Sequence, residues 1–266
     1  MVEPLLETRK LCRYFGGVKA NRDIDLRVMP GSITSLIGPN GAGKTTVFNA
    51  ITGIFAPTSG EVIVRHPRLG TRSIGGWRPD RICAFGLART FQNIHLFADL
   101  PVIDNVKVGL HPRTRRGVLS AIFRTPGFLR EEDEIHAAAL HYLAFVGLLE
   151  AEHDLATNLA YGDQRKLEIA RALATGPVLL LLDEPAAGMN PTETLALMEL
   201  IRKIRDAGVT VLLIEHDMKL VMNISDYVYV MDHGELIAHG PPVAVRSDPR
   251  VIEAYLGPGG GEHGHG

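Results

Sequence analysis

The segment Gly38–Thr45 has the residue types and the spacing of a phosphate-binding loop. It consists of Gly-Pro-Asn-Gly-Ala-Gly-Lys-Thr, which fits the pattern G-x-x-x-x-G-K-[ST], with an apolar strand expected before it and a helix after it. The glycines allow successive N–H groups to point at phosphate oxygens, Lys44 adds a cation, and Thr45 offers a hydroxyl to Mg²⁺. We therefore predict that ATP is bound by the run Gly38, Pro39, Asn40, Gly41, Ala42, Gly43, Lys44, Thr45 and Thr46.

Two adjacent carboxylates, Asp183 and Glu184, directly follow the apolar run 178–182. An unbroken apolar run of this kind is typical of a buried strand in a parallel sheet. Ligands bind at the carboxyl ends of such strands in open α/β sheets. One carboxylate can therefore hold the Mg²⁺ shell while its neighbour acts on the attacking water. Alone the pair would say little, but downstream of a phosphate-binding loop it predicts an ATPase site.

The segment Leu159–Leu173, Leu-Ala-Tyr-Gly-Asp-Gln-Arg-Lys-Leu-Glu-Ile-Ala-Arg-Ala-Leu, resembles the signature motif of ABC transporter ATPases, Leu-Ser-Gly-Gly-Gln, followed by its helix. Gly162 keeps the second glycine, whereas Ala160 replaces the serine, Tyr161 the first glycine and Asp163 the glutamine. The missing serine hydroxyl puts its usual bond to the γ-phosphate in doubt. A backbone amide and the helix N-terminus can still serve an anion. In isolation, an ordinary amphipathic helix after a turn fits this segment about as well.

Other positions of that family's pattern fall into register along the chain. Tyr14 lies where these ATPases place an aromatic ring that stacks on adenine, and Asn190 lies in the D-loop, where Asp is commoner. Gln92, in Arg-Thr-Phe-Gln-Asn, lies where a glutamine joins the Mg²⁺ and the attacking water and relays to the membrane domains. His216 matches the switch histidine that contacts the γ-phosphate. Taken singly, each of these residues would more often be structural.

The resemblance implies a role for each candidate. It implies three catalytic residues, Glu184, His216 and Gln92. It implies three Mg²⁺ ligands, Thr45, Gln92 and Asp183. Tyr14 joins the phosphate-binding loop at the nucleotide, while Ala160 and Gly162 act in trans on the ATP of a second ATPase subunit. The implied cofactors are ATP and Mg²⁺, with each ATP held between two subunits.

A narrower resemblance rests on Arg-Thr-Phe-Gln, the signature segment, Asp-Glu-Pro-Ala-Ala-Gly-x-Asn-Pro, Glu-His-Asp-Met-Lys-Leu-Val-Met and Ala-Tyr-Leu-Gly. These segments are similar to ATP-binding subunits of high-affinity branched-chain amino-acid importers, the LivG type, and so is an insertion around 111–131. The implied partners are a second ATPase subunit (a sister subunit or another copy), two transmembrane permease subunits and, indirectly, a periplasmic binding protein. The alternatives are a sister ATPase for urea or lipopolysaccharide and a soluble ABC ATPase in translation or DNA repair. Soluble ones usually carry two cassettes or a long coiled coil.

Strand and helix patterns alternate along the chain and predict an α/β fold: a P-loop NTPase core of the ABC ATPase type with a mostly parallel sheet, an N-terminal antiparallel β patch and a helical subdomain. We expect one domain over 1–257, with its core at about 1–93 and 165–257 and its helical subdomain at about 94–164. Residues 65–85 are expected to be loop, 232–235 the turn of a hairpin, and 258–266 a disordered Gly/His tail. A helix is expected to begin at Asn190, with Pro191 and Glu193 in its first turn.

The overall composition and net charge indicate the compartment in which the protein works and the partners it lacks. Apolar residues make up 45% of the chain, charged residues 22%, and the net charge is −2, so nothing predicts a nucleic-acid partner. No signal peptide and no membrane span are predicted. Cys12 and Cys83 are expected to be free thiols in a reducing compartment. We therefore expect a cytoplasmic protein, peripheral on the inner face of the cell membrane, whose spans come from other chains.

Overall fold

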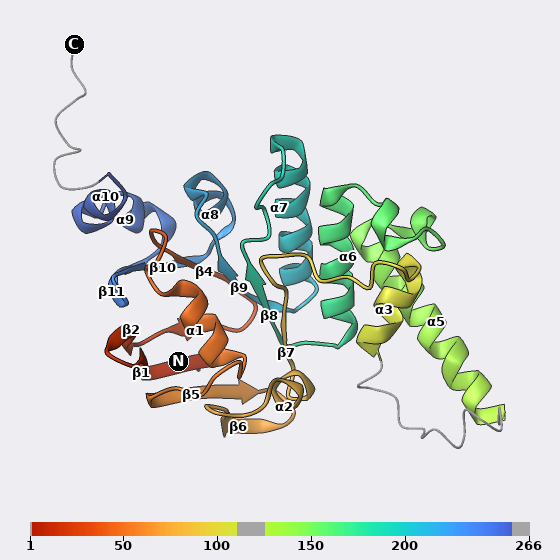
Figure 1. Ribbon diagram of the computed structural model, residues 1–266, viewed down its shortest axis with the longest axis horizontal. Helices are drawn as coiled ribbons and strands as arrows, with labels where there is room; N and C mark the ends of the chain where they lie inside the picture. Colours follow the sequence, from red (N-terminus) through yellow and green to blue (C-terminus); the bar gives the residue numbers. More distant parts are fainter. Residues whose placement is uncertain (1, 111–125, 257–266) are drawn as a thin grey trace, which may run out of the picture.

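A computed structural model describes residues 2–110 and 126–256 of the chain. The predicted tail at 258–266 and most of the insertion around 111–131 lie outside the described residues. Two sheets lie side by side, and a group of helices occupies the opposite end of the molecule (Figure 1).

The larger sheet is six-stranded, in the order β11-β10-β4-β9-β8-β7. Its neighbouring strands pair in parallel, except that β10 and β11 form an antiparallel hairpin at one edge. The central strands are fully buried, as expected for a parallel sheet covered on both faces. The strands are β4 (Ile33–Ile37), β7 (Leu87–Arg89), β8 (Leu179–Asp183), β9 (Thr210–Ile214), β10 (Tyr227–Asp232) and β11 (Glu235–Gly240). The predicted mostly parallel sheet is confirmed.

The smaller sheet contains the N-terminal strands and is antiparallel, as predicted. Its order is β2-β1-β5-β6, and β3 also pairs with β1. The strands are β1 (Leu6–Phe15), β2 (Val18–Ile24), β3 (Arg27–Val28), β5 (Ser59–His66) and β6 (Gly70–Ser73). The loop expected at 65–85 is wrong in part, because it contains β6 and the helix α2 (Pro79–Ala84). All four residues of β6 are exposed, so this strand has no apolar alternation in its sequence.

Three helices pack against one another at the far end of the molecule (Figure 1): α3 (Val102–Leu110), α5 (Pro126–Val146) and α6 (Tyr161–Ala174). Two short 3-10 turns, Leu149–Ala151 and Ala156–Asn158, connect α5 to α6. The apolar side chains of this group join those of β8 and α7 in one core. The subdomain boundary proposed at 164/165 falls inside α6, which is a single unbroken helix.

The remaining helices flank the parallel sheet: α1 (Lys44–Ile51), α7 (Pro191–Asp206), α8 (Met218–Ile224), α9 (Pro242–Arg246) and α10 (Pro249–Leu256). Helix α7 starts where predicted. Asn190 accepts from the backbone of Glu193, and the Glu193 side chain accepts from the backbone of Asn190, which is a complete capping box. The predicted hairpin is also present. His233 and Gly234, its two turn residues, both have positive φ, as a tight hairpin turn requires.

Candidate functional site

The phosphate-binding loop joins the end of β4 to the start of α1, as predicted. Its first glycine, Gly38, has a φ of 152°, and a Cβ there would meet the Met231 carbonyl oxygen at 2.1 Å. Gly43 has a φ of 96°, and a Cβ there would meet the Ala20 carbonyl oxygen at 2.5 Å. Glycine is therefore required at both positions for two reasons. The backbone has a positive φ, and a carbonyl oxygen of another segment lies where a Cβ would be.

Lys44 is buried beneath this loop. Its Nζ donates to the carbonyl oxygens of Gly38 at 2.7 Å and Pro39 at 2.9 Å. Burial lowers the pKa of Lys44, although the carboxylates of Glu184 and Asp183 oppose the shift. The ammonium group is already desolvated, so it can bind phosphate oxygens in place of these two carbonyl oxygens.

A cavity opens beside the loop. It is lined by Asn40, Gly41, Gly43, Lys44, Thr45 and Thr46 on one side and by Gln92 and Glu184 on another. Residues 18–20 of β2 and the turn at 233–234 complete its wall. The structure thus brings six of the nine predicted phosphate-binding residues and two predicted catalytic residues around one space.

The three predicted catalytic side chains meet beside this cavity, where Gln92 and Glu184 also line an adjoining pocket with His216. Nε2 of Gln92 donates to Oε2 of Glu184 at 3.1 Å, and Nδ1 of His216 lies 3.7 Å from the same oxygen. They follow β7, β8 and β9, which are neighbours in the parallel sheet. Because the carboxyl ends of parallel strands meet at one edge, residues far apart in sequence converge there.

Asp183 is held by a residue that the sequence analysis did not single out. Its Oδ2 accepts from Arg89 at 2.7 Å, and both side chains are almost completely buried. Arg89 also donates to Asn49 at 2.6 Å and Thr52 at 3.0 Å, which tie it to α1. The guanidinium fork therefore fixes one oxygen of the aspartate.

The other oxygen of that aspartate, Oδ1, is buried and has no partner among the described residues. Buried polar atoms are nearly always satisfied, so an orphaned carboxylate oxygen points to a missing ligand. The Thr45 hydroxyl, on the cavity wall, supplies a second hard oxygen. This donor set fits Mg²⁺, which typically takes one or two protein oxygens together with phosphate oxygens and water.

The other predicted contacts lie apart from the cavity wall. Tyr14 does not line the cavity; its ring lies 5.7 Å from Nζ of Lys19, which does. Ala160 and Gly162 do not line it either. Gly162 packs on α7, where an added Cβ would lie 3.0 Å from Oε1 of Glu193.

Two further residues at the site were missed. Glu215 is buried between the D-loop and His216, and accepts from the amides of Ala186 at 2.9 Å and His216 at 3.2 Å. Burial raises its pKa, and these amides oppose the rise. Tyr255, on α10, lines the same gap as Glu184 and His216, and burial raises its pKa to about 12. Both residues lie in segments that carried the narrower resemblance, but the contacts that bring Glu215 to Ala186 and Tyr255 to Glu184 join parts of the chain far apart in sequence.

The fold and the site define a P-loop ATPase whose catalytic groups lie at the edge of a parallel sheet. The family model described as ABC transporter matches residues 21–187, and the model described as branched-chain amino acid ATP-binding cassette transporter matches residues 235–257. The chain belongs to the ABC transporter family of ATP-binding cassettes and is an ABC ATPase.

The relatives extend over the whole chain. It is 48% identical to the high-affinity branched-chain amino acid transport ATP-binding protein LivG of Escherichia coli, over 97% of this chain and 99% of that one. It is 47% identical to the corresponding protein BraF of Pseudomonas aeruginosa, with the same coverage. Among solved structures it resembles the ADP conformation of MJ1267, an ATP-binding cassette of an ABC transporter, with a TM-score of 0.82 and 32% identity over 96% of this chain and 99% of that chain.

Proposed function

We propose that this chain is the ATP-hydrolysing subunit of an importer of branched-chain amino acids. The observation that carries the catalytic part is that Gln92 and His216 both lie against Glu184, which shares one cavity with Gln92 and Lys44. The substrate part rests on the names of relatives that match the chain from end to end. No residue of this chain need touch the amino acid itself.

Each group at the cavity has a distinct task in hydrolysis. Lys44 and the loop amides bind the β- and γ-phosphates, while Glu184 accepts a proton from the attacking water. Gln92 positions Glu184 and the water, and His216 contacts the γ-phosphate from the third strand. When bound, Mg²⁺ neutralises charge on the phosphates, and Asp183 and Thr45 are the residues that would hold it, with Gln92 nearby.

The ATP is proposed to lie between two ATPase subunits. Ala160 and Gly162 lie apart from the chain's own phosphate-binding loop, yet they begin α6, whose N-terminal amides suit an anion. The facing subunit's signature segment therefore completes each site. The second subunit is a sister chain or another copy of this one.

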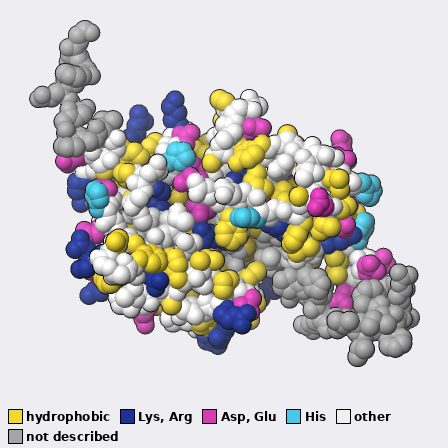
Figure 2. Space-filling model, viewed as in Figure 1, with side chains coloured by type: hydrophobic (Ala, Val, Ile, Leu, Met, Phe, Trp, Pro, Cys, Tyr) yellow, Lys and Arg dark blue, Asp and Glu magenta, His cyan; other side chains and the backbone are white. Residues whose placement is uncertain are grey.

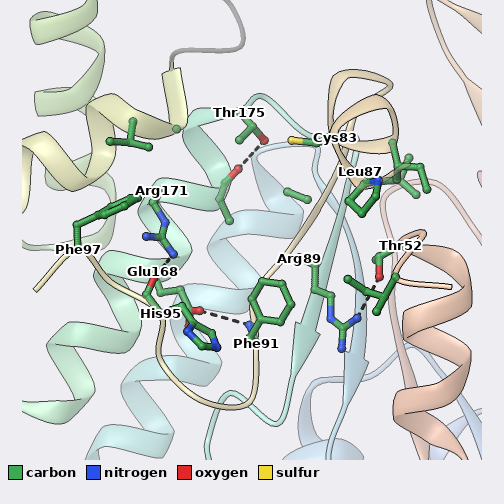
Figure 3. Close-up of a pocket in the computed structure, with 17 residues that line it drawn as sticks. Thr52, Cys83, Leu87, Arg89, Phe91, His95, Phe97, Glu168, Arg171 and Thr175 are labelled. Carbon is green, nitrogen blue, oxygen red and sulfur yellow. Dashed lines mark hydrogen bonds between the residues drawn. The ribbon is translucent and has the colours of Figure 1, made fainter. Parts of the chain in front are cut away.

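A groove between the core and the helical group is the proposed docking site for a permease. Its volume is about 490 Å³, and Figure 3 shows Phe91, His95 and Phe97 along it, opposite Cys83 and Leu87. Phe91 and Phe97 are 39% and 48% exposed, an unusual state for two large apolar side chains in one groove. Phe91, which lines the groove, directly precedes Gln92, so a docked segment would contact the neighbour of a proposed catalytic residue.

The proposed location is the inner face of the cell membrane. Among residues 2–110 and 126–256, none of the helices has both the length and the apolar character to cross a bilayer. On the face drawn in Figure 2, positive and negative side chains are interspersed rather than gathered by sign. Attachment is therefore proposed to depend on the permease subunits.

Uptake of labelled leucine tests the substrate and Lys44 together. A strain lacking its own branched-chain importer ATPase is supplied with this chain, its neighbouring permease and binding-protein genes, or the same set carrying Lys44→Ala. We expect uptake only with the unchanged lysine, and calorimetry should show that Lys44→Ala no longer binds ATP. Uptake of urea instead of leucine, Ile or Val would contradict the proposed substrate, and unchanged ATP affinity would contradict the site.

A further inference from the structure

Arg165 is the largest side chain that is completely buried in the described part of the chain. It lies in the first turns of α6, shortly after residues 159–163, the five residues that match the signature motif itself. It pairs with Glu168 one turn later at 2.6 Å, and the ion pair is almost inaccessible to solvent. A buried ion pair contributes little net stability, because the loss of hydration offsets the attraction between the charges. Its presence therefore calls for a reason other than packing.

The pair holds the backbone of the segment that carries Gln92. Arg165 donates to the carbonyl oxygen of Phe91 at 2.7 Å and to that of Gln92 at 2.8 Å. The other oxygen of Glu168 accepts from the amide of Phe91 at 3.3 Å, and Figure 3 shows Glu168 reaching from its helix to this loop. The arginine fork and the carboxylate thus satisfy three backbone polar groups of two consecutive residues, which lie outside any helix or strand.

Fixing this backbone also fixes where the side-chain amide of Gln92 lies. Its backbone is fixed by Arg165, while its side chain is free of the helix and reaches Glu184 at 3.1 Å. The two ends of this residue therefore connect α6 to the catalytic carboxylate. A shift of about 1 Å at a positioned group can cost on the order of a hundredfold in rate.

We propose that Arg165, paired with Glu168, is a positioning residue for ATP hydrolysis that sets Gln92 against Glu184. Arg165 lines neither the nucleotide cavity nor the proposed docking groove, so it acts through the loop backbone, whereas its partner Glu168 also lines the groove. Because α6 starts at the signature segment, the pair also makes that segment and Gln92 move as one unit. The inference rests on the catalytic role proposed above for Gln92.

The test must separate positioning from folding. Removing Arg165 alone leaves the buried Glu168 carboxylate without its partner and is expected to destabilise the fold. Replacing both members of a buried pair with apolar residues of similar size is often tolerated. The main variant is therefore Arg165→Met with Glu168→Leu. Arg165→Lys is the conservative variant, because it keeps the charge but lacks the planar fork that reaches two carbonyls.

A matched control comes from α7. Arg202 pairs with Glu199 at 2.5 Å and donates to the carbonyl oxygen of Asn223 at 2.9 Å, so this surface pair joins α7 to α8, away from the cavity. Arg202→Met with Glu199→Leu should leave turnover within about twofold, as expected for a surface substitution. All variants are made in the full chain assembled with its partner subunits and assayed with MgATP.

In the main variant we expect kcat to fall by about 10- to 100-fold, with the KM for ATP changed by less than about threefold, because the phosphate-binding loop is untouched. Arg165→Lys should recover part of the loss. Hydrogen exchange at the Phe91 amide should accelerate, while the melting temperature stays close to that of the unchanged protein.

The decisive comparison introduces the main variant into a protein that already carries Gln92→Ala. If Arg165 acts through Gln92, the main variant should lower kcat no further in that background, since both changes remove the same contact. Losses that multiply, or an unchanged kcat in the main variant, would overturn the positioning role. If Gln92→Ala alone leaves kcat unchanged, the proposed catalytic role of Gln92 is wrong, and the positioning role is wrong with it.

Discussion

Glu184 adopts a backbone conformation that few residues other than glycine take. Its φ is 44°, which costs an L-residue on the order of 1–3 kcal/mol. Its amide donates to the Ile214 carbonyl oxygen at 3.0 Å, and its carbonyl oxygen accepts from the Ala187 amide at 3.2 Å. The chain turns sharply at the end of β8 as a result, so that Asp183 stays buried against Arg89 while the next carboxylate faces the cavity. Adjacent carboxylates thus gain different environments and different tasks.

Glu184→Gln separates basicity from shape at this position. An amide oxygen can still accept from Gln92, so the loop and the Asp183 site should remain in place, but the proton acceptor is lost. We expect hydrolysis to fall by about a hundredfold or more, with ATP still bound. Sedimentation in MgATP, with the natural partner present, should show a two-subunit state that persists because the reopening step is blocked.

Asp183→Asn provides the contrast for that experiment. It weakens the proposed Mg²⁺ site and the Arg89 pair, so both the activity and the ATP-stabilised pair of subunits should be lost. Substantial turnover in Glu184→Gln would move the proton acceptor elsewhere, with His216 as the next candidate.

At this scale the sequence revealed the residues that face the nucleotide but not those that hold them. The phosphate-binding loop, Glu184 and Gln92 lie in local patterns whose spacing predicts their chemistry. Arg165 and Arg89 lie within motifs quoted for the family resemblance, yet the contacts that give them a role cross 74 and 94 positions of sequence. No local spacing predicts contacts of that range.

At the scale of elements, Glu7 joins three strands of the antiparallel sheet. Its carboxylate, on β1, accepts from Arg65 of β5 at 2.6 Å and from Arg9 at 3.1 Å, and lies 3.5 Å from Arg27 of β3. Hydrogen bonds from Arg9 and Arg65 lower the pKa of Glu7 from 4.5 to about 2. This sheet supports β2, which forms part of the nucleotide cavity wall, so its stability bears on the site.

Glu7→Gln should therefore destabilise the protein in a pH-dependent way. Because the folded pKa lies below the unfolded one, the contribution of Glu7 is complete above about pH 4.5 and is lost as the pH falls toward 2. Screening of the exposed Arg9 and Arg27 limits the loss to about 1–2 kcal/mol at pH 7. Urea unfolding at pH 7, 5, 4 and 3 should show the difference between the two proteins shrinking below pH 4.5.

The exposed pair Arg78–Asp80 is the control for that series. Asp80→Asn should change stability by less than about 0.5 kcal/mol at every pH. A constant penalty for Glu7→Gln from pH 7 to pH 3 would mean that packing, and not the charge, accounts for the effect.

Elements with strong start signals or apolar periods were predictable, and those without them were not. The capping box of α7 and the buried strands β8 and β9 appear directly in the sequence. Strand β6 is exposed along its length and pairs with β5 through its backbone alone, so its side chains give no period-2 pattern. The α6 boundary was likewise hidden, because the signature segment and the helix it begins form one continuous element.

At the scale of the whole molecule, the proposed function places the two halves of an ATP site in different parts of one subunit. The phosphate-binding loop opens on one cavity, while Ala160 and Gly162 begin a helix outside it. Arg165 connects this second half to Gln92 of the first. A single subunit would therefore bind ATP but lack the contacts that complete hydrolysis. Hydrolysis would then require two ATPase subunits to associate.

ATP turnover should accordingly depend on protein concentration. When the chain and its natural partner are diluted together, the rate per subunit should fall roughly in proportion to concentration once pairs dissociate, by mass action. The assay follows phosphate release over a thousandfold dilution at saturating MgATP. Ala160→Asp serves as the control, because Ala160 is exposed at the start of α6 and a carboxylate there, facing the proposed partner's γ-phosphate, should abolish turnover at every concentration while the variant's own ATP affinity, measured by calorimetry, stays unchanged. A rate per subunit that remains flat across the dilution series would mean that each chain hydrolyses ATP alone, and the trans role of the signature segment would then be wrong.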